Sequence, residues 1–165
     1  MKYFLLSICF VLIANIAFAG DSIPARSSKH QLGLNVGSVT GLGLAYRYTE
    51  SKLMHQVTFL PVVTSGFSFV DLSYSLFYKL KEREYTDFNL YCGTHALIVS
   101  QNSTTTVGSV TGGGFGFDFK LGSYFTANLN GGFALYSMPG STYDASSSRS
   151  FMILPAGELG LFYKL

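Results

Sequence analysis

The alternation of side chains is clearest in the stretch Val70-Asp71-Leu72-Ser73-Tyr74-Ser75-Leu76-Phe77-Tyr78-Lys79-Leu80. Every second residue from Leu72 to Leu80 is leucine or tyrosine. The residues between them are small or polar, with Phe77 as the exception. Successive side chains of a β-strand point to opposite faces, so this period of two predicts a strand with one apolar face and one small or polar face.

The same two-faced pattern recurs in seven other segments. These are 31–37, 42–48, Leu53–Leu60, Phe88–Val99, Val107–Leu121, Phe125–Tyr136 and Phe151–Leu165. The expected connections are Ser38–Thr40, Glu50–Lys52, Pro61–Gly66, Lys81–Thr86, Ser100–Thr106, Gly122–Ser123 and Pro139–Ser150. Such a series of strands predicts an all-β protein, a closed antiparallel up-and-down barrel of about eight strands.

The first residues predict export from the cytoplasm. A lysine at position 2 precedes the apolar run Phe4–Ile13, and Ala17-Phe18-Ala19 then forms a small-x-small cleavage site. These three features are typical of a secretory signal peptide. We therefore expect residues 1–19 to be the signal, 20–29 a flexible lead-in with Pro24, and 30–165 the barrel. Cleavage would remove Cys9 and leave Cys92 as a single thiol, which cannot form an internal disulfide.

The composition indicates a barrel in a membrane. Charged residues are 12% of the chain and aromatic residues 16%, whereas charged residues make up roughly 25% of an ordinary soluble domain. After the signal there is no uninterrupted apolar run of about 18 residues, which excludes a helical membrane protein and leaves a barrel as the membrane-compatible fold. The formal net charge of +2 gives no reason to expect nucleic acid as a partner.

The polar face of the strands decides which side is the interior. A soluble barrel would carry many Lys and Glu residues on the face that meets water, whereas this face is mostly Gly, Ser, Asn, Thr and Ala. Small residues suit a narrow eight-stranded lumen, so we expect the apolar face to contact lipid. An aromatic girdle near the strand ends would then contain Tyr46, Tyr48, Tyr78, Tyr124 and Tyr163.

Eight ionisable residues project inward in this arrangement. They are Arg47, Asp71, Lys79, His95, Asp118, Lys120, Glu158 and Lys164. Charges in a narrow interior have to be paired, because an unpaired one costs several kcal/mol. The pattern therefore predicts a polar network that plugs the barrel and leaves no open pore. If both termini are periplasmic, Pro139–Ser150 and Ser100–Thr106 lie outside, and Glu50–Lys52 and Lys81–Thr86 lie on the periplasmic side.

The final residues carry a family resemblance. The stretch Glu158-Leu159-Gly160-Leu161-Phe162-Tyr163-Lys164-Leu165 resembles the terminal insertion signal of bacterial outer-membrane proteins, with a polar residue, a glycine two positions later and then alternating hydrophobic or aromatic residues. Leu165 departs from the phenylalanine that is commoner there. The strand count and spacing also resemble the small eight-stranded outer-membrane barrels of the OmpX group and the OmpA transmembrane domain. This resemblance implies a Gram-negative outer membrane, contact with its lipid, and insertion by the barrel-assembly machinery.

One group of residues suggests catalysis. If the turn centres near Glu84, His95 falls opposite Ser73 and diagonal to Asp71, which brings together a nucleophile, a base and an orienting acid. Lipid A deacylase and palmitoyltransferase barrels use such residues, but His95 here is followed by Ala96-Leu97 and not by the His-x-Ser-Asn context of the deacylases. A hydrogen-bonded structural histidine is the favoured interpretation.

The remaining motifs predict no cofactor and no metal. His30 and His55 are far apart in sequence, and no His, Cys or Asp cluster has metal-ligand spacing. The glycines of 112–116 lack the Lys-Ser/Thr ending of a phosphate-binding loop, so close packing or strand bending explains them better. Cys92 is expected to face lipid.

Three functions follow from these observations. The leading one is an integral outer-membrane barrel with a structural or surface-interaction role, binding any surface ligand at its outer loops. The second is a lipid-modifying enzyme, for which His95→Ala would abolish turnover. The third is a soluble exported barrel that binds an apolar ligand and is extracted without detergent.

Overall fold

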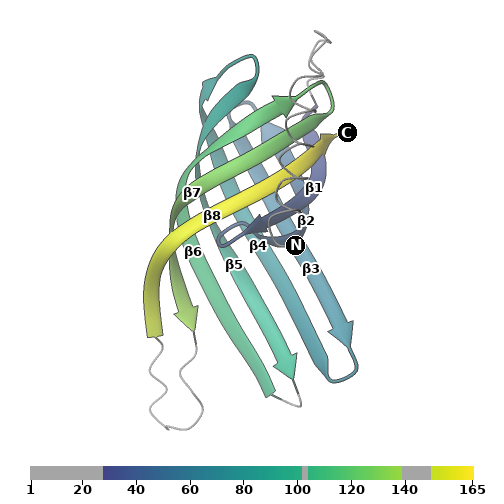
Figure 1. Ribbon diagram of the computed structural model, residues 1–165, viewed down its shortest axis with the longest axis vertical. Helices are drawn as coiled ribbons and strands as arrows, with labels where there is room; N and C mark the ends of the chain where they lie inside the picture. The colour runs from purple at the N-terminus through teal and green to yellow at the C-terminus, as the bar shows by residue number, and fades with distance from the viewer. Residues whose placement is uncertain (1–27, 102–103, 139–149) are drawn as a thin grey trace, which may run out of the picture.

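The computed structural model describes residues 28–101, 104–138 and 150–165, which form one closed antiparallel barrel (Figure 1). Each strand pairs with its neighbours in sequence, and β1 pairs with β8 to close the wall. The strands are β1 (His30–Gly37), β2 (Gly41–Glu50), β3 (Leu53–Thr64), β4 (Phe67–Glu82), β5 (Thr86–Gln101), β6 (Thr104–Leu121), β7 (Phe125–Met138) and β8 (Ser150–Lys164). The predicted fold class and strand number are confirmed.

The strands are longer than predicted at three connections. β3 continues to Thr64 and β4 starts at Phe67, so most of the predicted loop Pro61–Gly66 is strand. The predicted loop Lys81–Thr86 shrinks to 83–85, and Ser100–Thr106 is strand up to Gln101 and again from Thr104. Pro61 misled the prediction because proline is tolerated where a strand pairs on one side. Of the predicted loop Pro139–Ser150, only Ser150 belongs to the described residues.

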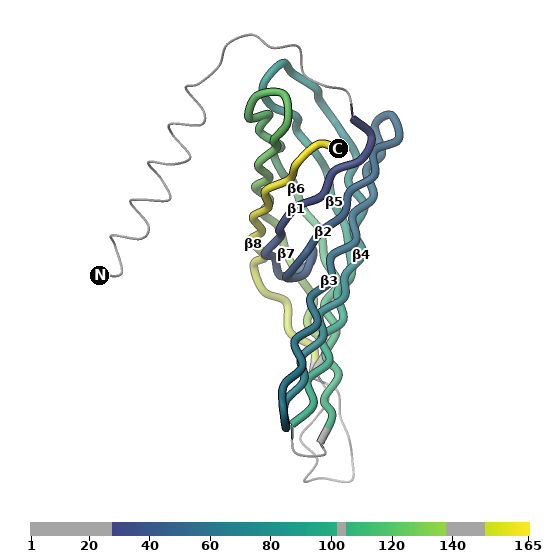
Figure 2. The backbone as a smooth tube through the Cα atoms, turned by 90° about the vertical axis from the view of Figure 1, so that its right-hand side faces the viewer, coloured from purple at the N-terminus to yellow at the C-terminus, as the bar shows by residue number. Residues whose placement is uncertain are grey.

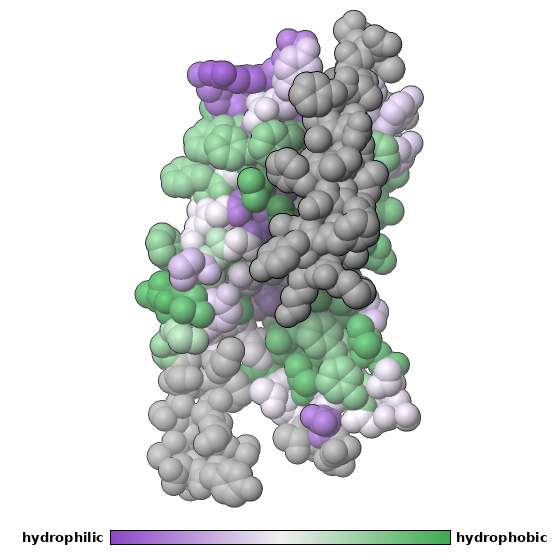
Figure 3. Space-filling view, viewed as in Figure 1, coloured by the Kyte–Doolittle hydropathy of each residue, from purple (hydrophilic) through white to green (hydrophobic). Residues whose placement is uncertain are grey.

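Along most of each strand, side chains alternate between a buried interior and an exposed apolar exterior. Exterior residues include Leu34 (62% exposed), Leu44 (60%) and Leu159 (61%). Figure 3 shows hydrophobic residues over much of the visible wall, with a cluster of strongly hydrophilic residues at the upper end. Such an exterior is unusual for a protein in water, since a soluble protein rarely exposes an apolar patch of more than a few hundred Å². No helix among the described residues is long and apolar enough to cross a membrane.

The wall has unequal height because β1 and β2 are short. β1 has 8 residues and β2 has 10, whereas β6 has 18. Within the described chain, β2 pairs with β3 only as far as Leu44–Phe59, and β1 pairs with β8 only as far as Gly37–Glu158. Beyond those pairs, the outer part of β3 pairs only with β4, and the outer part of β8 pairs only with β7. The wall is therefore open between β3 and β8, below the β1–β2 turn in Figure 1. The tube in Figure 2 likewise ends its β1–β2 hairpin well above the tips of β3 and β4.

Candidate functional site in the barrel lumen

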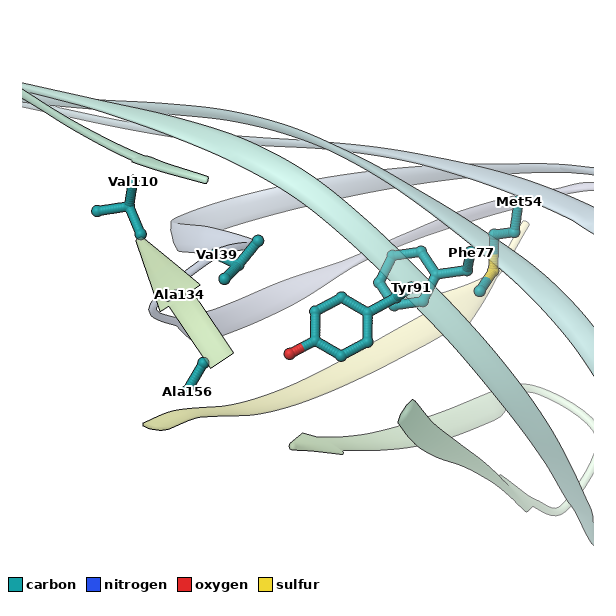
Figure 4. Close-up of a cluster of buried hydrophobic side chains, with 7 residues drawn as sticks. All are labelled: Val39, Met54, Phe77, Tyr91, Val110, Ala134 and Ala156. Carbon is teal, nitrogen blue, oxygen red and sulfur yellow. The ribbon is translucent and has the colours of Figure 1, made fainter. Parts of the chain in front are cut away.

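The β1–β2 turn, Ser38–Thr40, folds into the lumen. Val39 and Thr40 are 0% exposed. In Figure 4, Val39 lies between the rings of Tyr91 and Phe77 on one side and small apolar residues of β6, β7 and β8 on the other. The sequence predicted only a connection between two strands here, and the structure places that connection inside the barrel.

Two glycines allow the chain to bend inward after the turn. Gly41 has φ 75° and Gly43 has φ 136°, a region that residues with a side chain rarely adopt. A Cβ on Gly41 would also lie 2.7 Å from both Asp71 Oδ1 and Ser73 Oγ. The turn can therefore approach β4 closely only because position 41 has no side chain.

Side chains from four strands hold the turn in place. On β1, Asn35 Nδ2 donates to Thr40 Oγ1 (2.7 Å) and to the carbonyl of Gly41 (2.8 Å). Ser73 Oγ on β4 donates to the carbonyl of Thr40, and His95 Nδ1 on β5 to that of Ser38 (3.1 Å). Glu158 Oε1 on β8 accepts from the backbone N–H of Val39 (3.2 Å). Because these strands surround the lumen, the turn is fixed across its width.

The three candidate catalytic residues lie together at this turn. Ser73 is the pairing partner of His95, and His95 Nε2 lies 3.0 Å from Asp71 Oδ2. The Ser73 hydroxyl is directed to Thr40, however, and within the described residues no hydrogen bond joins it to His95. A histidine base has to accept the proton of the serine it activates. In this arrangement Ser73 and His95 each bond a carbonyl of the turn, and Asp71 faces the His95 ring.

A second network lies deeper, at mid-barrel, around a fully buried arginine. Arg47 Nε donates to Gln56 Oε1 (2.6 Å), and its Nη1 lies 3.2 Å from Asp118 Oδ1. The guanidinium also lies over the ring of Phe162, 3.6 Å from the ring centre. Asp118 accepts further hydrogen bonds from Asn89 (3.0 Å) and Asn128 (2.7 Å). These contacts satisfy charges that would otherwise be costly in the interior.

The amide side chains of β7 connect the two networks. Asn128 and Asn130 exchange hydrogen bonds of 2.9 and 2.7 Å. Asn130 Nδ2 then donates to Glu158 Oε2 (3.1 Å), whose other oxygen holds the turn. A continuous path of polar contacts thus runs from Arg47 to the β1–β2 turn.

The end of the barrel near the C-terminus contains a polar cavity of about 430 Å³. Asp87 lies between two lysines there, 3.3 Å from Lys79 Nζ and 2.8 Å from Lys120 Nζ. Glu82 lies 3.5 Å from Lys79 Nζ and 3.8 Å from Lys120 Nζ. Lys164 also lines this cavity. Of the eight ionisable residues expected inside, Arg47, Asp71, Asp118, Glu158 and Lys164 are buried, and the side chains of His95, Lys79 and Lys120 are 11, 17 and 18% exposed.

The proposed insertion signal is split between the two faces of β8. Glu158 points inward and is buried, and Gly160 follows on the same face with Asn35 Oδ1 near its missing side chain. Tyr163 is 42% exposed and Leu165 49%. Tyr163 stacks on Tyr124, with ring centres 6.0 Å apart.

Two further histidines, His30 and His55, lie on the outside of the wall. His30 Nδ1 lies 2.6 Å from the hydroxyl of Tyr46, and His55 Nδ1 lies 2.8 Å from that of Tyr74. Among the described residues, no three His, Cys, Asp or Glu side chains form a group that could hold a metal ion. Cys92 is exposed on the outer face.

Comparisons with known proteins give one structural likeness. No protein-family model matches the chain, and a search of curated proteins found no match. Among solved structures the barrel is similar to the "Crystal structure of Neisserial surface protein A (NspA)", with 13% sequence identity and a TM-score of 0.48, covering 82% of this chain and 94% of that chain.

The sequence analysis missed the apolar lining at the outer end of the lumen. Inward positions there are not small or polar: Val62, Phe69, Leu97 and Leu154 follow the buried polar residues along the same faces of their strands. The signal was present in runs that are apolar on both faces, such as Phe151-Met152-Ile153-Leu154. A rule based on alternation alone cannot find such a lining, because the alternation disappears there.

Proposed function

We propose that the chain is an integral outer-membrane β-barrel with a closed lumen and a structural or surface-interaction role. The observation that carries this proposal is an apolar exterior around an interior of paired charges and amides, closed by the β1–β2 turn. Transmembrane barrels present an apolar band to lipid, and a water-filled pore would need a continuous polar channel. Val39 at 0% exposure occupies the place of such a channel.

Cell fractionation and bilayer conductance test the two halves of this proposal. We expect the protein in the outer-membrane fraction, extracted only with detergent, with a gel mobility that changes on boiling. In planar bilayers the purified protein should give no stable conductance steps. A protein released without detergent would instead support the soluble barrel, and steady single-channel currents would show that the lumen is open.

The pairing of Ser73 with His95 supports a lipid-modifying enzyme as a second candidate. Catalysis would require the turn to leave, which would free the Ser73 hydroxyl and His95 Nδ1. The test is release of fatty acid from a lipid substrate by the refolded protein and by Ser73→Ala and His95→Ala. Turnover that both variants abolish while keeping the heat-dependent gel mobility would favour the enzyme. Absence of turnover in the unmodified protein would leave the structural role.

A further inference from the structure

The polarity of the residues that line the lumen changes at the β1–β2 turn. On the side toward the C-terminus it contains Arg47, asparagines and carboxylates, whereas on the other side most inward residues are apolar, with Thr64, Gln101 and Thr106 on the same face. Val62 continues the interior face of β3, which carries Gln56 and Thr58, and Leu154 continues that of β8 beyond Ala156 and Glu158. We define the apolar bowl as Val62, Phe69, Leu97, Val99, Val110 and Leu154, which line the lumen outward of the turn.

The bowl is not filled by the described part of the chain. Val62 is 37% exposed and Leu154 38%, although both continue the inner faces of their strands. Its floor is formed by Val39 of the turn, which packs with Val110, Ala134 and Ala156. Covering these side chains with an apolar group is favourable, because apolar surface is stabilised when it is removed from water.

The open wall connects the bowl sideways to the exterior. Leu60–Thr64 of β3 and Ser150–Gly157 of β8 border the opening (Figure 1). Ile153 at 69% exposure and Phe151 at 64% lie on the outer face of β8, next to Leu154 on its inner face. The apolar exterior and the apolar bowl therefore form one continuous surface around the edge of β8.

Both edges of the opening carry a proline. Pro61 lies in the part of β3 that pairs only with β4, and Pro155 lies in the part of β8 that pairs only with β7. Proline has no N–H to donate, so neither edge is well suited to pair with a strand from another protein. A hydrocarbon chain needs no hydrogen bonds and can pass between such edges.

We propose that the apolar bowl binds the hydrocarbon chain of a membrane lipid, which enters sideways between β3 and β8 and ends on Val39. Continuity with the lipid-facing exterior identifies this occupant, and the two prolines disfavour a peptide strand. The proposal rests on the membrane location proposed above. The parts of β3 and β8 that pair on one side only thus form the two edges of a lateral opening for the lipid chain.

Tryptophan fluorescence in brominated lipid tests the proposal, because the chain has no tryptophan of its own. Leu97→Trp places the probe in the bowl, and Ile98→Trp places it one residue along on the outer face. Tyr91→Trp places it on the other side of the turn, among buried side chains. Each variant is reconstituted in phosphatidylcholine vesicles with or without bromine on the acyl chains, after its heat-dependent gel mobility has shown that it is folded.

We expect brominated lipid to remove more than half of the fluorescence of both Leu97→Trp and Ile98→Trp and little of that of Tyr91→Trp. Adding Val62→Asp and Leu154→Asp at the opening should protect Leu97→Trp and leave Ile98→Trp unchanged. If brominated lipid quenches Ile98→Trp but not Leu97→Trp, the bowl does not hold lipid and the proposal is wrong. This conclusion holds whether or not iodide added to the aqueous phase quenches Leu97→Trp. If neither is quenched, the barrel is not in the membrane and the proposed function fails as well.

Discussion

At the scale of single residues, Arg47 shows how a charge is accommodated inside a narrow barrel. Its side chain is fully buried, paired with Asp118, bonded to Gln56 and stacked on Phe162. Removing one partner of such a pair leaves the other buried without compensation, and this costs more than the pair itself contributes.

We therefore expect Arg47→Met to lower the free energy of unfolding by about 3–5 kcal/mol. The double variant Arg47→Met/Asp118→Asn should lose clearly less, because it removes the stranded negative charge and keeps one of the two oxygens that accept from Asn89 and Asn128. Urea titration in lipid vesicles, with the folded fraction read from unboiled gels, measures both. If both variants lose the same free energy of unfolding, leaving Asp118 buried without Arg47 carries no cost to stability.

Gly41 tests the role of the turn. An alanine there adopts an unfavourable positive φ, at about 1–2 kcal/mol, and its methyl group meets Asp71 and Ser73. We expect Gly41→Ala to displace the turn and to produce conductance steps in planar bilayers where the unmodified barrel is silent. Gly131→Ala is the matched control, since a Cβ there has no atom within 4 Å. A silent Gly41→Ala barrel of normal stability would show that the turn tolerates the change.

At the scale of elements, the sequence predicted the strands but not the inward path of the shortest hairpin. Alternation in 70–80 and its counterparts predicts strands and their faces because each residue contributes independently to that pattern. The inward path of the β1–β2 turn depends on the backbone conformation of Gly41 and Gly43 and on acceptors and donors from β4, β5 and β8. Those groups are distant in sequence, and the Gly-x-Gly spacing of 41–43 was the one local sign of an unusual bend.

The outer parts of β3 and β8 lead to a prediction about association. Replacing Pro61 and Pro155 with valine restores an N–H on each unpaired edge, and an exposed edge of this kind pairs readily with another chain. We expect the double variant to form dimers or larger species in detergent, seen by chemical cross-linking and light scattering, while the unmodified barrel stays smaller. Val63→Thr, on the exposed side of β3, controls for changed polarity. An unchanged size distribution would show that the edges are protected by something other than the prolines.

At the scale of the whole molecule, the exterior distinguishes a membrane barrel from a soluble one. Lysine on the lipid-facing side of a barrel costs about 2–4 kcal/mol at mid-membrane and about 0–1 near the interface. Leu34 pairs with Leu44 and Leu161 in the apolar wall, whereas Tyr124 lies in the connection between β6 and β7. We expect Leu34→Lys to be more destabilising than Tyr124→Lys by roughly that difference. Urea unfolding from vesicles measures the stability of both variants. Equal stabilities would place both positions in water.

The turn inside the lumen is also linked to the closure of the barrel. The seam between β1 and β8 runs from the pair Gln31–Lys164 to the pair Gly37–Glu158, immediately beside the turn. Glu158, at the last pair of that seam, is also the acceptor for Val39. Placing the turn and closing the seam therefore involve the same residue. A chain that closes with the turn outside would leave the Glu158 carboxylate without the Val39 N–H at the last pair of the seam.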